Sequence, residues 1–394
     1  MLSVAINAVS AKSGGAATYI ENLGKELAKS DYGNQYLFCI PPKRVASLEG
    51  LGDRIRVVAS DVGYRSSWRR QLWDQVTLRQ ILRKEHVDVL LSSSDFGMWF
   101  PPCKQILMVR NPLFFSPLFL RTVLPNKSRQ FRLEFWIRRW LISLSVRASD
   151  IVIAASRSMM ADLKQLIPVP DSKAVVNSFG VPLERFSWNQ LGASEKVQRD
   201  SERPCQLLYV SEYSDYKNLT TLLKAVSIMR TQGMADFRLM TTADPSQFPE
   251  VEIVTREQDR ALVSHPHIAP FVKFTGSIPY EDVPNLYMQS DLFVFPSLAE
   301  SFGHPLVEAM ASGLPIIASD IPICREICGD AAVYFSPLDP NDLAEKIMSL
   351  RNDSGLRQRL GRLGRKRAEV HFDWKDHVRR LVGIIERVAA NGRG

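Results

Sequence analysis

The 394-residue sequence has few cysteines and no long apolar run. Its five cysteines are scattered, odd in number and without a CxxC pair, which is typical of reduced thiols and excludes a disulfide framework or a cysteine zinc site. No stretch of eighteen apolar residues occurs, so we expect no transmembrane helix. The amino-terminal residues 1–10 have no basic n-region, so we expect no secretory signal and a cytoplasmic location.

Several chemical signatures are also missing. The chain has no GxSxG nucleophile elbow and no Walker loop. It has no zinc-finger spacing, recognition helix or aromatic-rich nucleic-acid motif, so we expect no nucleic-acid partner. A hydrophobic content of 45% and a charged content of 23% are ordinary for a soluble globular protein, and the length predicts two domains. The formal charge of +8 indicates an anionic partner, either a lipid surface or a substrate.

The basic excess is concentrated in the region from Arg121 to Arg147, which holds seven basic residues and one acid, Glu134. Tryptophans and other apolar residues alternate with the arginines. A basic helix of this kind can lie on an anionic membrane surface, which would make the protein peripheral to the membrane. The alternative is an ordinary helix with an apolar side in the core and solvated arginines. The apolar run 113–120 is compatible with either interpretation. A second basic stretch, 351–367, is predicted to be a solvated helix face.

The amino-terminal half alternates short apolar segments with helical patterns, which predicts a parallel sheet covered by helices. The segments expected to form strands are 3–7, 36–40, 55–58, 87–91, 105–109, 150–154 and 174–176. Helices are expected after the glycine pair Gly14 and Gly15, over 67–83 and over 156–166. A strand–helix series restarts at 207–210, after a polar connector at 187–203.

The most informative segment is 299–313. It follows a predicted buried strand, 291–296, and opens a helix that ends at Gly313, before another strand at 314–319. Pro305 suits the first position of the helix, because proline has no N–H to leave unpaired there. The N–H groups of the preceding residues then lie at a helix N-terminus, which favours an anion such as phosphate. These residues are Phe302, Gly303 and His304.

Two carboxylates, Glu300 and Glu308, flank this predicted anion site. They would repel phosphate, but they accept hydrogen bonds from hydroxyl groups. A ligand with phosphates in the middle and hydroxyls at both ends would match both the anion site and the two glutamates. A nucleotide diphosphate sugar is such a ligand. The alternative is an ordinary strand–helix crossover with surface glutamates.

The segment from 272 to 319, with two glutamates separated by seven residues, resembles the carboxyl-terminal half of the retaining glycosyltransferases of family 4 (glycosyl transferases group 1). The resemblance implies the GT-B fold: α/β, with two Rossmann-like domains facing a central cleft and a carboxyl-terminal helix that returns to the first domain. The domains expected are 1–182 on the acceptor side, 183–372 for the nucleotide sugar, and 373–394 for the returning helix.

The resemblance also assigns roles. Glu300 would contact the transferred sugar, Glu308 the ribose, and the backbone from Phe302 to Pro305 the sugar and the pyrophosphate. Lys217, after a predicted strand, matches the family's pyrophosphate lysine, and it would stabilise the leaving diphosphate without a metal. The glycine pair matches the glycine loop of the first domain. No Asp-x-Asp is present, so we expect neither a metal nor another cofactor.

The sequence departs from the family pattern at two places. Glu212 stands where many members have an arginine, five residues before the lysine. Arg110 and Asn111 stand where many members have a histidine. The hypothesis is that Arg110 supplies the lost positive charge to the donor; the alternative is a structural arginine at a strand end.

The function expected is transfer of a hexose from a UDP- or GDP-sugar to a hydroxyl of a glycan or lipid-linked glycan, with retention. Bacterial surface polysaccharide synthesis is the process it would serve. Two alternatives stay open, since fold does not decide activity. One is a sugar-nucleotide epimerase on the same fold, which would need no acceptor. The other is a non-catalytic protein that binds the nucleotide sugar or glycan.

Overall fold

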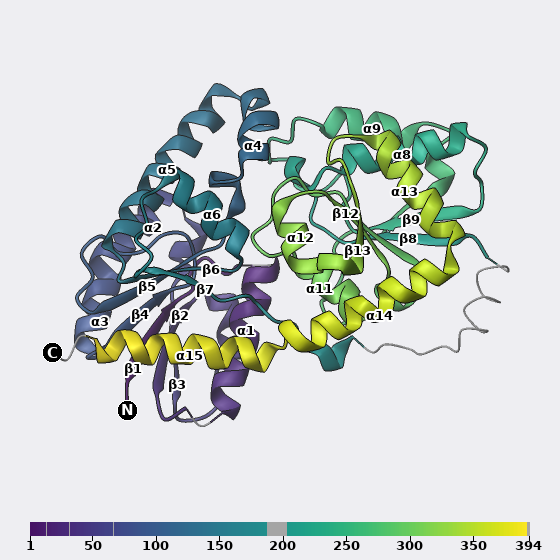
Figure 1. Ribbon diagram of the computed structural model, residues 1–394. Helices are drawn as coiled ribbons and strands as arrows, with labels where there is room; N and C mark the ends of the chain where they lie inside the picture. The colour runs from purple at the N-terminus through teal and green to yellow at the C-terminus, as the bar shows by residue number, and fades with distance from the viewer. Residues whose placement is uncertain (13, 31, 66, 187–202, 392–394) are drawn as a thin grey trace. The chain divides into compact units, whose positions relative to one another are not determined.

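The computed structural model describes all residues except 13, 31, 66, 187–202 and 392–394, and it divides into two compact units (Figure 1). Unit 1 comprises Met1–Phe115, Leu133–Ser178 and Lys375–Gly394, and unit 2 comprises Ser116–Arg132 and Phe179–Trp374. All but the last residue of the predicted connector lies outside the described residues. The domain boundaries predicted from the sequence stay a prediction. The sequence did not indicate that residues 116–132 pack with unit 2.

Unit 1 is built on a parallel sheet of seven strands in its described part, in the order β3-β2-β1-β4-β5-β6-β7. The strands are β1 (Ser3–Asn7), β2 (Gln35–Ile40), β3 (Ile55–Ala59), β4 (Val89–Ser92), β5 (Lys104–Val109), β6 (Ile151–Ala154) and β7 (Ala174–Val176). The central strands β1, β4 and β5 are almost wholly buried, which explains their continuous apolar runs. All seven strands lie within two residues of the segments predicted from the sequence.

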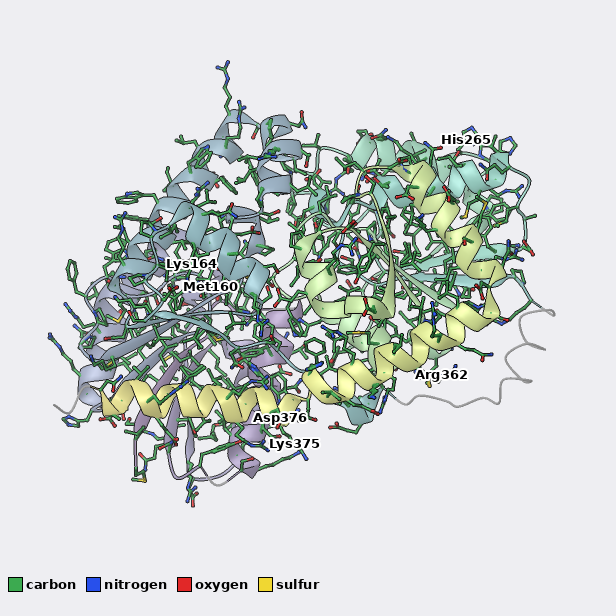
Figure 2. All side chains as sticks on the ribbon, viewed as in Figure 1. Met160, Lys164, His265, Arg362, Lys375 and Asp376 are labelled. Atoms are coloured by element: carbon green, nitrogen blue, oxygen red, sulfur yellow. The ribbon has the colours of Figure 1, made fainter. Side chains whose placement is uncertain are left out.

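Helices and short turns of unit 1 connect these strands, and their side chains surround the sheet (Figure 2). They are α1 (Gly14–Lys29), η1 (Pro42–Ser47), η2 (Asp61–Tyr64), α2 (Ser67–Trp73), η3 (Asp74–Leu78), α3 (Arg79–Lys84), η4 (Pro112–Phe114), α5 (Arg129–Ala148, from Leu133 on) and α6 (Arg157–Leu166). The predicted helix 67–83 is present, but η3 is a π-helical turn within it. That turn carries the buried Asp74, whose Oδ1 accepts a hydrogen bond of 2.8 Å from Asn7 Nδ2.

The carboxyl-terminal helix α15 (Trp374–Ala390) belongs to unit 1 from Lys375 onward. Its buried His377 lies with Nε2 3.0 Å from the Tyr19 hydroxyl on α1 and with Nδ1 3.0 Å from the Ser178 carbonyl oxygen. Arg380 donates a further bond of 3.1 Å to Asn177 Oδ1. Polar contacts therefore hold this helix to the first sheet unit, as the GT-B resemblance implies.

Unit 2 is built on a second parallel sheet, with six described strands in the order β10-β9-β8-β11-β12-β13. The strands are β8 (Cys205–Tyr209), β9 (Phe237–Thr241), β10 (Val272–Phe274), β11 (Leu292–Phe295), β12 (Ile316–Ser319) and β13 (Ala332–Phe335). All four side chains of β11 are buried, because apolar packing covers the strand on both sides. The predicted strand at 291–296 is confirmed, one residue shorter at each end.

The helices and turns of unit 2 include the segment that carries the glutamates. They are α4 (Pro117–Thr122), η5 (Leu124–Asn126), η6 (Leu183–Arg185), η7 (Asp215–Lys217), α8 (Leu219–Thr231), α9 (Arg256–Ser264), η8 (Ala269–Phe271), α10 (Val283–Met288), α11 (His304–Ala311), α12 (Pro322–Cys328), η9 (Gly329–Ala331), α13 (Pro340–Asn352) and α14 (Ser354–His371). Gly361 allows α14 to approach the end of α11 closely, since a Cβ there would lie 2.4 Å from the Gly313 carbonyl oxygen.

The prediction that the basic stretch 351–367 is a solvated face is wrong for two of its arginines. Arg365 donates to the carbonyl oxygens of Phe186 and Ala311, the latter at the end of α11. Arg367 donates to carbonyl oxygens near the end of α12. At Ala311, Glu326 and Ile327 these guanidinium groups bind carbonyl oxygens in the last turns of α11 and α12, which have no partner within their own helices, and periodicity alone does not reveal such contacts.

Candidate functional site

The loop between β11 and α11 folds as its residues require. Gly303 adopts φ +81° and precedes the helix, a conformation that side chains with a Cβ rarely adopt. The helix begins at His304, so Pro305 is its second residue and not its first, one position later than predicted. Phe302 is buried, with its ring 5.5 Å from that of Phe372. The buried phenylalanine anchors the loop, so that the first N–H groups of α11 lie at the carboxyl edge of the sheet.

Lys217 and Glu300 meet in unit 2, although 83 residues separate them in the sequence. The lysine follows β8, the glutamate follows β11, and these strands are neighbours in the sheet. Lys217 Nζ donates a hydrogen bond of 2.5 Å to Glu300 Oε1. Burial lowers the pKa of Lys217, but the Glu300 carboxylate together with the Tyr216 and Tyr209 side chains raises it, and the pKa lies above its ordinary value. The lysine is therefore held as a cation against Glu300, in the loop that leads into α11.

The turn that carries Lys217 is itself fixed by hydrogen bonds. Tyr209 donates its hydroxyl to the Lys217 carbonyl oxygen at 2.7 Å. Asn218, with φ +56°, donates from Nδ2 to the carbonyl oxygens of Pro296 at 3.0 Å and Pro337 at 2.8 Å. This left-handed conformation is one that asparagine tolerates better than most residues. Asn218 thereby joins the lysine turn to the end of β11, just before Glu300.

Glu308 lies one turn into α11 and is buried, with 5% of its surface exposed. Tyr287 donates its hydroxyl to Glu308 Oε2 at 2.9 Å. Burial raises the pKa of Glu308 to about 7, and hydrogen bonds from Tyr287 and Tyr280 oppose that rise. The predicted surface-glutamate alternative is therefore wrong for this residue. His304 stacks on Phe179, with ring centroids 5.2 Å apart and planes 20° apart.

The other predicted site residues lie in unit 1. Gly14 and Gly15 begin α1, and a Cβ on Gly15 would have no neighbour within 4 Å. The Arg110 guanidinium lies over the Tyr19 ring at 4.6 Å from its centroid. The backbone N–H groups of Arg110 and Asn111 both donate to Asp95 Oδ1, at 2.8 and 2.9 Å. Arg110 is therefore held at the carboxyl end of β5.

Sequence reasoning missed an ion pair directly beside the lysine turn. Lys127 Nζ lies 2.5 Å from Asp215 Oδ2, and the two side chains are only 4% and 6% exposed. Asp215 Oδ1 accepts a 2.7 Å bond from the Val254 N–H, and Lys127 also donates to the Glu252 carbonyl oxygen. No local pattern pairs residues 88 positions apart, so no signal in the sequence identifies this contact.

The ion pair also corrects the prediction for the basic region. Lys127 is not part of a basic surface, because its ammonium is buried in unit 2. The apolar run 113–120 is largely buried as well: Phe114, Phe115 and Phe119 have at most 6% of their surface exposed. Glu212, the departure from the family pattern near Lys217, is exposed.

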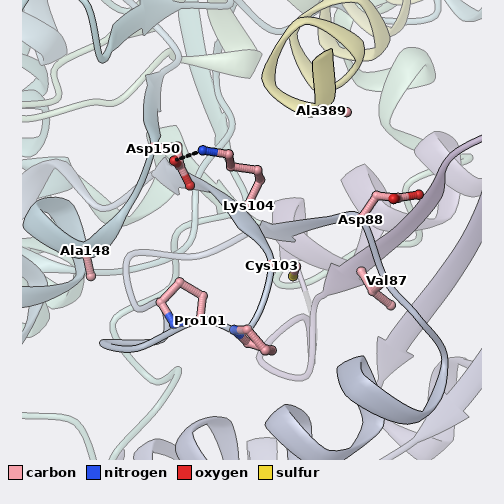
Figure 3. A pocket seen from close by; sticks show the side chains of 9 residues that line it. Val87, Asp88, Pro101, Cys103, Lys104, Ala148, Asp150 and Ala389 are labelled. Carbon is pink, nitrogen blue, oxygen red and sulfur yellow. Dashed lines mark hydrogen bonds and ion pairs between the residues drawn. The ribbon is translucent and has the colours of Figure 1, made fainter. Parts of the chain in front are cut away.

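A cavity of about 580 Å³ in unit 1 does not coincide with any of these residues (Figure 3). It lies at the amino ends of β4, β5 and β6, the opposite edge from Arg110. Its Lys104 and Asp150 pair with each other at 3.1 Å, and Asp150 also accepts from the Gln105 N–H. Among the residues that the structure describes, no cluster of three or more His, Cys, Asp or Glu side chains has the arrangement to hold a metal ion.

The two parallel-sheet units and the site on the second define a two-domain α/β protein of the GT-B type. A family model described as "Glycosyltransferase Family 4" matches residues 13–185, and one described as "Glycosyl transferases group 1" matches residues 193–367. The two matches together run through most of the chain and agree with the resemblance found from its motifs. The chain belongs to the GT-B glycosyltransferases of the group 1/family 4 type.

Individual proteins that are similar to this chain share a low sequence identity with it. O-antigen chain mannosyltransferase B of Escherichia coli is 26% identical over 220 residues, which cover 51% of this chain and 54% of the relative. The chain thus spans about half the length of that protein. The structure of sucrose-phosphate synthase from Thermosynechococcus elongatus matches with a TM-score of 0.78 and 18% identity, covering 99% of this chain and 100% of that one. Anabaena Alr3699/HepE in complex with UDP-glucose matches with a TM-score of 0.72 and 17% identity, covering 98% and 100%.

Proposed function

We propose that the protein is a glycosyltransferase that moves a hexose from a UDP- or GDP-sugar to a hydroxyl group of a glycan, with retention at the anomeric carbon. One observation carries the proposal: at the carboxyl edge of the second sheet, the Lys217 ammonium binds the Glu300 carboxylate in the loop that leads into α11. The cation and the helix N-terminus favour a diphosphate, and the carboxylate accepts hydrogen bonds from sugar hydroxyls. Ligands of open α/β sheets bind at this edge.

The proposed reaction is a front-face substitution. The bond between the anomeric carbon and the diphosphate oxygen breaks, and the acceptor oxygen forms its bond on the same face of the sugar. The acceptor proton passes to the leaving diphosphate. Lys217 and the N–H groups at the start of α11 stabilise the negative charge that develops there. Glu300 orients the sugar, and Glu308 holds a ribose hydroxyl.

The names of similar proteins support a nucleotide sugar as the donor and polysaccharide synthesis as the process. HepE was solved with UDP-glucose, and the Escherichia coli relative acts on the O-antigen chain, by its name. We propose a nucleoside diphosphate hexose as donor and a growing surface polysaccharide, free or lipid-linked, as acceptor. The protein would work in the cytoplasm at the inner face of the membrane.

The α5 helix supports a membrane-linked acceptor. It exposes four large apolar side chains at positions i, i+3, i+4 and i+7, each between 49 and 64% exposed; they are Leu133, Trp136, Ile137 and Trp140, called here the Trp136 patch. The Arg139 guanidinium stacks over the Trp136 ring at 4.9 Å. Aromatic side chains beside arginines are typical of helices that lie in a bilayer interface. No helix in the described part of the chain has the length and hydrophobicity to cross a bilayer.

The experiment is a panel of UDP- and GDP-hexoses, each incubated with the protein and with candidate glycan acceptors, with release of free nucleotide diphosphate as the readout. Lys217→Met is expected to lower release strongly, and Lys273→Met, an exposed lysine of the same unit, is the matched control. Sugar isomerisation without an acceptor would identify an epimerase instead. Thermal stabilisation by a donor with no turnover in any mixture would identify a binding protein. Proton NMR of the product decides between retention and inversion.

A further inference from the structure

The Arg110 side chain is held in a fixed place by its neighbours in unit 1. Its guanidinium lies over the Tyr19 ring, 4.6 Å from the ring centroid. The N–H groups of Arg110 and Asn111 donate to Asp95 Oδ1, which fixes the backbone just after β5. A cation over an aromatic ring is attracted by the negative face of that ring. The backbone and the guanidinium of Arg110 therefore each have a defined contact.

Tyr19 is itself fixed, because its hydroxyl group binds the carboxyl-terminal helix. Tyr19 lies on α1 and is only 2% exposed. Its hydroxyl oxygen is 3.0 Å from Nε2 of His377, a fully buried residue of α15. The two rings meet edge to face, with centroids 5.6 Å apart and planes 65° apart. The first and the last helix of the chain therefore both contact the ring on which Arg110 lies.

The partners of these hydrogen bonds determine their direction. His377 Nδ1 lies 3.0 Å from the Ser178 carbonyl oxygen, which can only accept, so Nδ1 carries a proton. In the neutral imidazole, Nε2 is then an acceptor, and the Tyr19 hydroxyl donates to it. One chain of contacts therefore runs from Ser178 through His377 and Tyr19 to the Arg110 guanidinium.

Stability alone does not explain these contacts. A buried imidazole and a buried hydroxyl lose their hydration, and the hydrogen bond between them returns little net free energy. Apolar side chains at positions 19 and 377 would pack the two helices as well. What the polar contacts add is a defined orientation for one cation, at the edge of a parallel sheet where ligands bind. A charged group that is already oriented does not have to be ordered during the reaction.

We propose that Tyr19 and His377 are positioning residues for Arg110 in the transfer of the sugar. Tyr19 supplies the ring that orients the guanidinium, and His377 holds that ring by its hydroxyl. Arg110 contributes its positive charge to the donor phosphates, the role hypothesised for it from the sequence. The inference rests on the proposed function and extends it, because it gives the carboxyl-terminal helix a part in the reaction.

The test is a double-mutant cycle in the full chain, with kcat and KM for release of nucleotide diphosphate as the readout. Arg110→Ala is expected to lower kcat about tenfold, and Tyr19→Leu about fivefold, with little change in KM. Because Tyr19 acts through Arg110, Arg110→Ala/Tyr19→Leu should lose only about tenfold, as Arg110→Ala does alone. Tyr19→Phe keeps the ring beneath the guanidinium and should recover most of the activity that Tyr19→Leu loses. His377→Gln should resemble Tyr19→Phe, because both remove the same hydrogen bond.

Tyr36→Leu is the matched control. Tyr36 is also 2% exposed in unit 1, but it lies near the amino end of β2, at the opposite edge of the parallel sheet from Arg110. Its kcat should equal that of the parent protein, with all variants compared below their measured melting temperatures. Losses that multiply to about fiftyfold in Arg110→Ala/Tyr19→Leu would overturn the inference, as would a Tyr19→Leu that is as active as Tyr36→Leu. Either result would leave the proposed function intact, whereas a parent protein that releases no diphosphate from any hexose donor would overturn both.

Discussion

Lys127→Met is expected to lower the unfolding temperature of unit 2 by about 10 °C. The substitution keeps most of the apolar stem but leaves the Asp215 carboxylate buried and without its cation. Breaking a buried ion pair by removing one partner costs about 3–5 kcal/mol. In a unit of this size each kcal/mol shifts the midpoint by roughly 2–4 °C. The magnitude follows from the burial of both side chains and the 2.5 Å separation of Nζ and Oδ2.

Scanning calorimetry of the full chain measures this shift, and two variants calibrate it. Lys104→Met breaks the pair with Asp150, whose side chains are 37% and 36% exposed, so the expected cost is only about 0–1 kcal/mol. Lys127→Met/Asp215→Asn leaves no unpaired charge and should recover most of the loss. If Lys127→Met melted within 2 °C of Lys104→Met, the burial argument would be refuted.

The same variant also bears on the site. Asp215 opens η7, and Lys217 closes it, so the ion pair lies two residues from the proposed diphosphate cation. We expect Lys127→Met to raise the KM for the donor, and Lys127→Met/Asp215→Asn to raise it less, at a temperature where both variants are folded. An unchanged KM in Lys127→Met would confine the pair to a structural role.

Four further substitutions test single residues. Lys217→Met should lower kcat/KM for diphosphate release by about 100-fold, the loss typical of a removed charge-stabilising donor; Arg110→Ala should lower donor turnover about tenfold, and a parental rate would exclude it from the reaction. In the folded protein the pKa of Glu308 is about 7, above the ordinary value of 4.5. The parent should therefore lose stability relative to Glu308→Gln as the pH rises from about 4.5 to about 7, and lose no more above pH 7. Melting temperatures of both proteins at about pH 5 and about pH 8 measure this difference. Gly303→Ala should destabilise by about 1–2 kcal/mol in urea unfolding, because φ is +81° there and the new Cβ would lie 3.1 Å from Leu306 Cδ1.

Local pattern was sufficient for the strands and for the glutamate segment. The run at β11 is apolar at every position, and the glycine and proline before α11 act directly on the backbone, so a few residues are enough to predict both elements. Local sequence does not predict that residues 116–132 pack with unit 2. Lys127 stands among arginines in the sequence, and only tertiary structure distinguishes its buried ammonium from theirs. The sequence also does not predict that Trp68 and Leu72 are exposed, because a helical period does not determine which face of the helix is covered.

Several largely buried charged groups of unit 2 belong to the segments that follow β8 and β11. Asp215 and Lys217 follow β8, Glu300 and Glu308 follow β11, and the two ion pairs are Lys217 with Glu300 and Lys127 with Asp215. Such groups contribute little net stability, because desolvation offsets most of the attraction between partners. A fold that required only a stable core would be served as well by apolar side chains at these positions. The ligand that we propose, with phosphates and hydroxyls, would supply the missing reason: it would need a fixed cation and fixed carboxylates, and partnered side chains hold such groups in place before a ligand arrives.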